Sequence, residues 1–257
     1  MRKTTLVILI LLMFGTGTLD LESEPREDFP GKLKTLKEKI EKSYFTFDSN
    51  KLERLLEQVE NATISNEKSW ILHYYVGLLR VQLGKIYYNP NPDLAYEYFD
   101  ESVKDLQKAL ELRESAELYA LLSCAYGKKS SLSTFAAFYY GLKAHDCIYK
   151  ARDLDAKNPK VYLIAATHLM HTPESFGGDK DWAERLLKKA MKINDKQSDT
   201  RLIKWAKDSE IYAYLAQLEI LRSNKDSAKK YIEKALSLQP DYGFVKYDLK
   251  EQLRKIK

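Results

Sequence analysis

The segment "YAYLAQLEILRSNKDSAKKYIEKALSLQP", residues 212–240, decides the fold class of this chain of 257 residues. Its second half spaces Ala228, Ile232 and Ala235 four and three residues apart. Side chains at these spacings lie on one stripe of an α-helix, and alanine allows a neighbouring helix to approach closely. The first half begins with an aromatic residue, and Pro240 ends the second because proline cannot continue a helix. The segment therefore predicts two helices packed against each other.

The alanine spacing of this second helix recurs three more times along the chain. Each copy has a small residue, a branched apolar residue, an alanine and a further apolar residue at steps of four, three and three. The last alanines are 42, 39 and 45 residues apart, which indicates a repeat protein. We expect each of these alanines to be buried where two helices meet. The copies are Ser102-Leu106-Ala109 with Leu112, Ala144-Ile148-Ala151 with Leu154, Ala183-Leu187-Ala190 with Ile193, and Ala228-Ile232-Ala235 with Leu238.

A second pattern precedes each alanine copy. It consists of an aromatic residue, an apolar residue, a small residue and a large residue at steps of three, one and three. Each repeat is therefore predicted to be a pair of helices, the first with an aromatic and a small contact residue. The copies are His73-Val76-Gly77-Arg80, which is the weakest, Tyr119-Leu122-Ser123-Tyr126, Tyr162-Ala165-Ala166-Leu169, and Tyr212-Leu215-Ala216-Glu219.

The two patterns resemble the tetratricopeptide repeat, whose signature has W-x2-L-G-x2-Y on its first helix and A-x3-F…P on its second. Ala216 and Ala228 are 12 positions apart, which matches the family, and "LDAKNP" at residues 154–159 resembles its usual inter-repeat turn. The repeat periods exceed the usual 34 residues, and a HEAT or armadillo array, with periods of about 40–47 residues, is the alternative fold. The resemblance implies an all-α protein, an α-solenoid of about four tetratricopeptide-like helix pairs with capping helices at both ends.

A longer stretch, residues 70–246, is similar to a group of exported bacterial tetratricopeptide proteins. The motifs that carry this likeness are "HTPESFGGD" at residues 171–179 and "PDYGFVK" at residues 240–246. The group has no established activity, so the resemblance implies an architecture and an exported location but no reaction.

The N-terminus also predicts export. Arg2 and Lys3 precede an apolar run at residues 6–14. This run is too short for a membrane span, which needs about 20 residues. A basic start, a short apolar run and small residues are typical of a secretory signal peptide, with an uncleaved membrane anchor as the alternative. We therefore expect a location in the periplasm or cell envelope. The expected organisation is a signal peptide at 1–18, a flexible linker at 19–30, an N-terminal helix pair at 31–65, repeats at 66–240 and a C-terminal capping helix at 241–257.

Charge and cysteine content exclude some partners and sites. Without residues 1–18 the chain has 40 basic and 37 acidic residues, which is too balanced to indicate nucleic-acid binding. Cys124 and Cys147 match no metal-binding motif. We expect no disulfide between them, because Cys124 should face the groove and Cys147 a different direction on the next helix.

No arrangement of residues in the sequence predicts catalysis. His145, Asp146 and Cys147 are adjacent, so on a helix their side chains point in different directions and cannot form a catalytic triad. His168 and His171 could bind zinc only with a third ligand from the following loop, and no HExxH motif is present. We therefore expect a protein that is not an enzyme and that holds no metal and no cofactor.

The loop "HTPESFGGDKDW", residues 171–182, has the residue types most often found in active-site loops. Each has a structural explanation: Pro173 ends the preceding helix, Gly177 and Gly178 allow positive φ, and Asp179 can cap the next helix. The sequence favours a structural turn, and the alternative is a ligand loop that folds over the groove.

In the tetratricopeptide family the first helices line a concave groove that holds the ligand. Transferring these positions gives a small and mostly apolar face with few charges, without the lysine and asparagine clamp of chaperone-binding members. Such a face would hold a protein or peptide, an apolar small molecule, or the protein's own caps. We expect a non-catalytic protein-binding scaffold or adaptor; the alternative is a periplasmic small-molecule or lipid-binding protein that assists a transporter. A membrane partner is expected only if the N-terminal segment stays uncleaved. The candidate groove residues are Tyr74, Leu78, Ala120, Cys124, Leu163, Thr167, Met170, His171, Ala213 and Gln217, and the candidate loop residues are Glu174 and Phe176.

Overall fold

The computed structural model describes residues 29–194 and 206–256, and these residues form eleven α-helices and no β-strand. Eight of the helices make four consecutive pairs at the positions of the four predicted repeats. The all-α solenoid that the resemblance to the tetratricopeptide repeat implies is confirmed. The pairs are α3 (Trp70–Tyr87) with α4 (Pro92–Leu112), α5 (Ala116–Leu132) with α6 (Ala137–Leu154), α7 (Pro159–His171) with α8 (Lys180–Asn194), and α9 (Asp208–Leu221) with α10 (Lys225–Leu238).

Further helices cap the two ends of the repeats. Before them lie α1 (Phe29–Phe45) and α2 (Ser49–Ser65), and after them a π-helical turn, η2 (Phe244–Leu249), continues into α11 (Lys250–Lys255). Helix α1 begins inside the interval expected to be a linker. The expected signal peptide lies outside the described residues. None of the helices at residues 29–194 and 206–256 combines the length and the hydrophobicity that a membrane span requires.

Polar side chains determine where several helices begin. Asn91, Ser115, Asn158 and Asn224 each accept a hydrogen bond from a backbone N–H in the first turn of α4, α5, α7 and α10. Asp48 does the same for α2. These bonds satisfy donors that have no partner within the helix, so each helix starts at a defined residue.

The small residues of the repeats lie where two helices meet. A side chain at Gly77 would place its Cβ 2.7 Å from Leu106 Cγ, so α3 and α4 approach more closely than any larger residue would allow. The last alanine of each of the four alanine copies is 0% exposed, which confirms the prediction that these alanines are buried where two helices meet. These alanines are Ala109, Ala151, Ala190 and Ala235.

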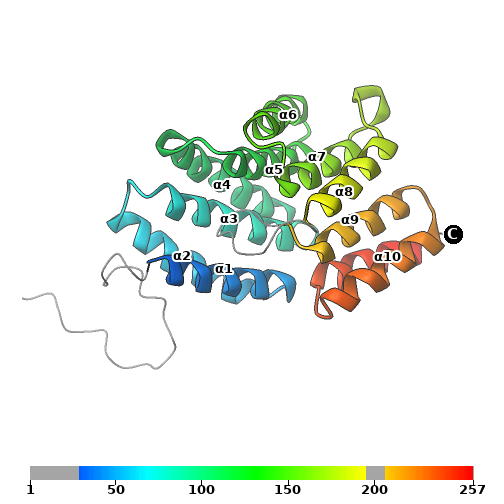
Figure 1. The fold of residues 1–257 in the computed structure, drawn as a ribbon, viewed down its shortest axis with the longest axis horizontal. Coiled ribbons are helices and arrows are strands. Elements are labelled where there is room, and N and C mark those ends of the chain that lie inside the picture. The colour runs from blue at the N-terminus through cyan, green and yellow to red at the C-terminus, as the bar shows by residue number, and fades with distance from the viewer. Residues whose placement is uncertain (1–28, 195–205, 257) are drawn as a thin grey trace, which may run out of the picture.

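The first helices of the pairs form an inner layer. Helices α1, α3, α5, α7 and α9 contact each other in that order, and α9 contacts η2. Each second helix packs mainly on the first helix of its own pair, and α4, α6 and α8 also contact the first helix of the next pair. Figure 1 shows the pairs following one another around an arc, from α1 in blue to α10 in orange and red.

The two ends of this arc touch. The ring of Phe45 in α1 packs on the ring of Tyr242 before η2, with 4.8 Å between their centroids. Asn89 Nδ2 donates a hydrogen bond of 3.0 Å to Asp248 Oδ1, which joins the turn after α3 to η2. Buried residues of α1 and of η2 belong to one continuous hydrophobic core. The sequence leaves open whether the groove holds a protein or peptide, an apolar small molecule or the protein's own caps. The structure shows the two caps in contact with each other at one side of the groove.

Candidate functional site

The residues predicted to line the groove divide into a buried and an accessible group. Six are packed in the hydrophobic core, behind the surface that the groove presents to solvent. Three are half-buried and one is exposed, so fewer residues are accessible in the groove than the sequence predicts. The buried six are Tyr74, Leu78, Ala120, Leu163, Met170 and Ala213; Cys124, Thr167 and Gln217 are half-buried, and His171 is exposed.

Two lysines extend this accessible face. Lys85 Nζ lies 5.5 Å from the centre of the Tyr44 ring, and Lys128 Nζ lies 4.4 Å from the centre of the Tyr88 ring. Burial lowers the pKa of the Lys128 ammonium, and the nearby charge of Lys85 acts in the same direction, whereas Cys124 and the carboxylate of Asp248 oppose it. No ion pair among the described residues includes either lysine. Two cations thus lie near each other on aromatic rings without a bound carboxylate.

His171 and Gln217 adjoin Lys128. Part of the His171 side chain reaches solvent, but packing around its ring lowers the pKa of the imidazole, and the charge of Lys128 lowers it further. The neighbouring side chain of Gln217 offsets part of that shift. We term the accessible side chains of Lys85, Cys124, Lys128, His171 and Gln217 the inner face. It is basic and polar, in contrast to the apolar face expected from the sequence.

The two lysines were detectable by helical spacing. Lys85 follows Tyr74 by 11 residues, close to three turns of helix, and Lys128 follows Cys124 by four, about one turn. Both therefore continue the stripes of the predicted groove residues toward the C-terminal ends of α3 and α5. They were missed because the repeat signature covers only the middle of each first helix.

A buried polar cluster ties α5 to α7 at the opposite end of the inner layer. Asn158 Nδ2 donates a hydrogen bond to Glu117, and Lys160 Nζ lies 3.9 Å from the same carboxylate. Burial lowers the pKa of Lys160, and the charge of Glu117 opposes this. Asn158 also caps α7, so one side chain both starts this helix and attaches it to the preceding repeat. The cluster therefore has a structural role.

Ser123 and His168 form the contact that most resembles a nucleophile with its base. Ser123 Oγ donates a 2.7 Å hydrogen bond to the Ala144 carbonyl and lies 2.8 Å from His168 Nε2. A hydroxyl has a single proton, so His168 Nε2 must carry the proton of the second bond and cannot accept one from serine. Ser123 is also fully buried. The pair therefore connects α5, α6 and α7 and does not activate a nucleophile.

The loop 171–182 is a turn between α7 and α8, as the sequence favours. Asp179 Oδ1 accepts a 2.7 Å hydrogen bond from the Trp182 backbone N–H and so caps α8. Gly177 has the expected positive φ of 88°, but Gly178 does not. A Cβ at Gly178 would overlap the Thr172 carbonyl oxygen, so this glycine is needed for close approach.

The two candidate loop residues point away from the packed part of the turn. Glu174 and Phe176 belong to a single 3-10 turn, η1 (Glu174–Phe176), and both are exposed. Glu174 lines a shallow open pocket together with Gly178, Asp179 and Arg222. The structure brings neither residue into the inner face.

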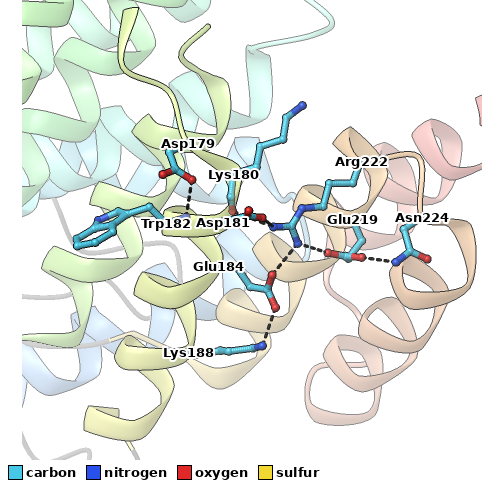
Figure 2. Close-up of polar contacts among 9 residues, drawn as sticks. All are labelled: Asp179, Lys180, Asp181, Trp182, Glu184, Lys188, Glu219, Arg222 and Asn224. Carbon is cyan, nitrogen blue, oxygen red and sulfur yellow. Dashed lines mark hydrogen bonds and ion pairs between the residues drawn. The ribbon is translucent and has the colours of Figure 1, made fainter. Parts of the chain in front are cut away.

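Arg222, just after α9, connects the α8 end of this turn to the last repeat. Figure 2 shows its guanidinium between Asp181 and Glu184 of α8 and Glu219 of α9, at 2.5, 2.7 and 2.7 Å. It also donates to the Lys180 carbonyl. Partial burial acts to lower the pKa of Arg222, but these hydrogen bonds raise it above its already high ordinary value, so the guanidinium remains charged. The arrangement is a clamp between two repeats.

No group of three or more histidine, cysteine or acidic side chains in the described part of the chain is arranged to hold a metal ion. His168 and His171, the pair considered for zinc, have other contacts: His168 with Ser123 and His171 with Gln217. Cys124 and Cys147 are both free thiols. Burial raises the pKa of Cys147 to about 11, so this thiol stays protonated and unreactive at neutral pH.

Sequence comparisons identify no relative, whereas structural comparisons do. No protein-family model matches the chain, and no curated protein matches it. A thermophilic TPR protein from Thermus thermophilus is similar in structure, with a TM-score of 0.57 and 18% identity over 81% of this chain and 93% of that one. The HusA haemophore from Porphyromonas gingivalis has a TM-score of 0.58 and 20% identity, over 73% of this chain and 90% of that one. Similarity at this level of identity establishes a shared fold.

Proposed function

We propose that this chain, which has the fold of tetratricopeptide repeat proteins, is a non-catalytic scaffold that binds a protein segment through its inner face. The observation that carries the proposal is the pair Lys85 and Lys128. Each ammonium lies over a tyrosine ring, and neither forms an ion pair with a described carboxylate. Glu210 acts on Lys85 and Asp248 on Lys128 only from beyond contact distance, so the bound segment would supply a carboxylate in direct contact.

The chemistry of the inner face favours a carboxylate with a polar flank. Lysine ammonium groups act as point charges for anions, and the rings beneath them hold their side chains in place. Gln217 and His171 would add hydrogen bonds to the peptide backbone on the α7 and α9 side. Acidic side chains or a free C-terminus of a partner protein provide this combination, so an acidic or C-terminal peptide segment fits best.

The test compares affinity capture by three forms of the protein. In the variant Lys85→Met/Lys128→Met the charges are removed and the apolar stems are kept. The control Lys229→Met/Lys234→Met removes two exposed lysines of α10. We expect one protein to be enriched from cell-envelope extract by the wild type and by the control, released by salt, and lost with the Lys85/Lys128 variant. Equal recovery by all three forms would reject the inner face as the binding site.

A small anionic ligand is the second candidate, favoured by the closure of the arc. Because Phe45 and Tyr242 join the two caps, the inner side is less open than the groove of an extended solenoid. The HusA haemophore shares the fold and is named for haem, an anionic apolar molecule. Native mass spectrometry of protein isolated from its own cells distinguishes the candidates. A bound small molecule that is lost on changing Lys128 or His171 would support this function over the scaffold.

Export to the periplasm or cell envelope is part of the proposal and rests on the sequence of residues 1–18. Their basic start and short apolar run are those of a cleaved signal peptide. N-terminal sequencing of the protein from a cell-envelope fraction tests it. A mature chain that begins near residue 19 is expected, and an intact Met1 on protein from the cytosolic fraction would contradict it.

A further inference from the structure

Helix α6 differs from the other second helices in the surface that it exposes. Among the described residues, α4, α8 and α10 each expose one large apolar side chain, Leu112, Trp182 and Leu238 respectively. Helix α6 and the turn before it expose a whole group. Its members are Phe135 at 101%, Phe138 at 70%, Tyr139 at 57%, Leu142 at 50% and Tyr149 at 44%, followed by Leu154 at 48%.

Most of these residues lie along one line of the helix. Phe138, Leu142, His145 and Tyr149 follow each other on the helix at steps of four, three and four residues, and Phe135, in the turn before α6, lies three residues before Phe138. This alternation is the spacing of the contact positions of a coiled coil, where one helix packs lengthwise on another. The His145 and Tyr149 rings already contact each other, with 4.3 Å between centroids. We term these five residues the α6 stripe.

The α6 stripe has no partner within the described chain. Helix α6 packs on α5 through Ala144, Cys147, Ile148 and Ala151, which lie on the other side of the helix. It also makes a few contacts with α7, and the Tyr140 hydroxyl hydrogen-bonds with the Tyr96 hydroxyl of α4. Figure 1 shows α6 at the outer edge of the molecule, beyond α5. The helix thus has one apolar face inside the fold and a second one outside it.

We propose that the α6 stripe is the contact surface between two copies of this chain, paired antiparallel about a two-fold axis at Leu142. The stripe is nearly symmetric about that residue, since Phe138 lies four positions before it and His145 three after it, while Phe135, in the turn before the helix, and Tyr149 are each seven positions away. A two-fold contact requires such a self-complementary patch, because the same residues supply both sides. In the antiparallel pair, aromatic side chains of one copy face aromatic side chains of the other.

The flanking charges fit this pairing. Lys143, Asp146, Lys150 and Asp153 alternate in sign beside the stripe. Lys143 and Asp146 lie one and four positions beyond Leu142, so reversing the second helix puts them five positions apart across the pair. At a rise of about 1.5 Å per residue this is about 7.5 Å along the axis, which a lysine side chain can span. The same reversal puts the two copies of Lys143 two positions apart, and Asp146 of each copy offsets the repulsion between them.

The exposed area is close to what a stable dimer needs. Aromatic side chains bury about 150–250 Å² each, so the exposed parts of Phe135, Phe138, Tyr139, Leu142 and Tyr149 provide about 600 Å². A standard interface buries about 800 Å² on each partner, and the flanking stems of Lys143 and Lys150 supply the remainder. At 18 residues, α6 is about 27 Å long, enough for the four helical members of the stripe to pair, with Phe135 in the turn before them.

The experiment is sedimentation of the purified protein over a range of concentrations, with matched variants. Wild type is expected to form a dimer that dissociates on dilution. Leu142→Glu places two carboxylates at the axis and should raise the dissociation constant at least 100-fold. Leu238→Glu, which adds the same charge at an equally exposed leucine of α10, should remain dimeric. Circular dichroism confirms that each variant is folded.

A charge-swap experiment tests the position of the axis. Leu142→Glu and Leu142→Lys should each be monomeric alone and should form a heterodimer when mixed, because opposite charges then meet at the axis. Wild type that remains monomeric at 100 µM would overturn the proposal, as would a Leu142→Glu variant that still forms dimers. Monomeric wild type that binds phosphatidylglycerol vesicles through Phe138 would assign the stripe to a membrane surface instead.

Discussion

The ring of Tyr242 meets the ring of Phe45 edge-on, with 4.8 Å between centroids and an angle of 86° between planes. These two residues belong to opposite ends of the solenoid, so their contact closes the arc of helix pairs. Aromatic edge-to-face contacts of this kind are favourable beyond the area that they bury. The closure holds Tyr44 beneath Lys85 and thereby supports the inner face.

Replacing Tyr242 with alanine should open this contact. The side chain is fully buried among Tyr44, Phe45 and Phe244, so the change should lower the free energy of unfolding by about 3–5 kcal/mol. Urea denaturation measures this loss, and small-angle scattering should show a larger radius of gyration. Tyr247→Ala, at an exposed position of η2, is the control and should cost less than about 0.5 kcal/mol. A Tyr242 variant with unchanged scattering would show that the caps stay together without this ring.

Gly177 and Gly178 should respond differently to the same substitutions. Gly177→Ala strains a residue at positive φ and should cost about 1–2 kcal/mol, whereas Gly177→Asn should recover part of this because asparagine tolerates that conformation. Gly178→Ala places a Cβ against the Thr172 carbonyl and should cost about 1–3 kcal/mol, and Gly178→Asn should recover nothing. Thermal unfolding distinguishes the two. The exposed Glu174→Ala serves as the control, and a large loss of stability there would contradict the turn.

Arg222→Met should loosen the connection between α8 and the last repeat. The change leaves Asp181, Glu184 and Glu219 near each other without their shared cation (Figure 2). We expect a loss of about 1–3 kcal/mol in the free energy of unfolding, partly restored by high salt, which screens the carboxylates. Arg185→Met on the exposed side of α8 should change it by less than about 0.5 kcal/mol. Equal effects of the two changes in urea denaturation would reject the clamp.

His168 should make stability depend on pH between about 4 and 6.5. Burial lowers its pKa from 6.5 to about 4, and Lys128, His171 and His145 act in the same direction. As the pH falls below 6.5, His168 takes up a proton in the unfolded chain before it does so in the folded protein, and this favours unfolding. The contribution of His168 to stability is therefore complete above pH 6.5 and is lost toward pH 4. The loss should reach about 1–3 kcal/mol.

A glutamine variant isolates this effect. His168→Gln keeps an N–H donor for Ser123 but does not titrate, so urea denaturation at pH 7.0 and 4.5 should show a smaller difference than for wild type. His171→Gln measures the parallel contribution of the neighbouring histidine, whose pKa is lowered by its surroundings as well. If His168→Gln kept the full pH dependence of wild type, the loss would have to come from other groups.

Much of the fold was predictable from the sequence because it depends on local spacing. The steps of four and three residues that place Ala190 on one stripe follow from the geometry of any α-helix, and burial of that stripe follows from its small size. The ends of helices were equally local, since Pro173 cannot continue α7 and Asp179 satisfies the first turn of α8. These features need no information about distant parts of the chain.

The tertiary structure alone decided how the repeats close and which surfaces remain free. Phe45 and Tyr242 are 197 residues apart, and their contact results from the small rotations added by each helix pair, which no local pattern encodes. The same curvature brings Lys85 of one repeat near Lys128 of the next. It also leaves the outer side of α6 uncovered, although the apolar spacing of that helix by itself would equally predict burial. Helical periodicity determines which residues share a face, whereas the superhelix determines whether that face is buried, enclosed or exposed.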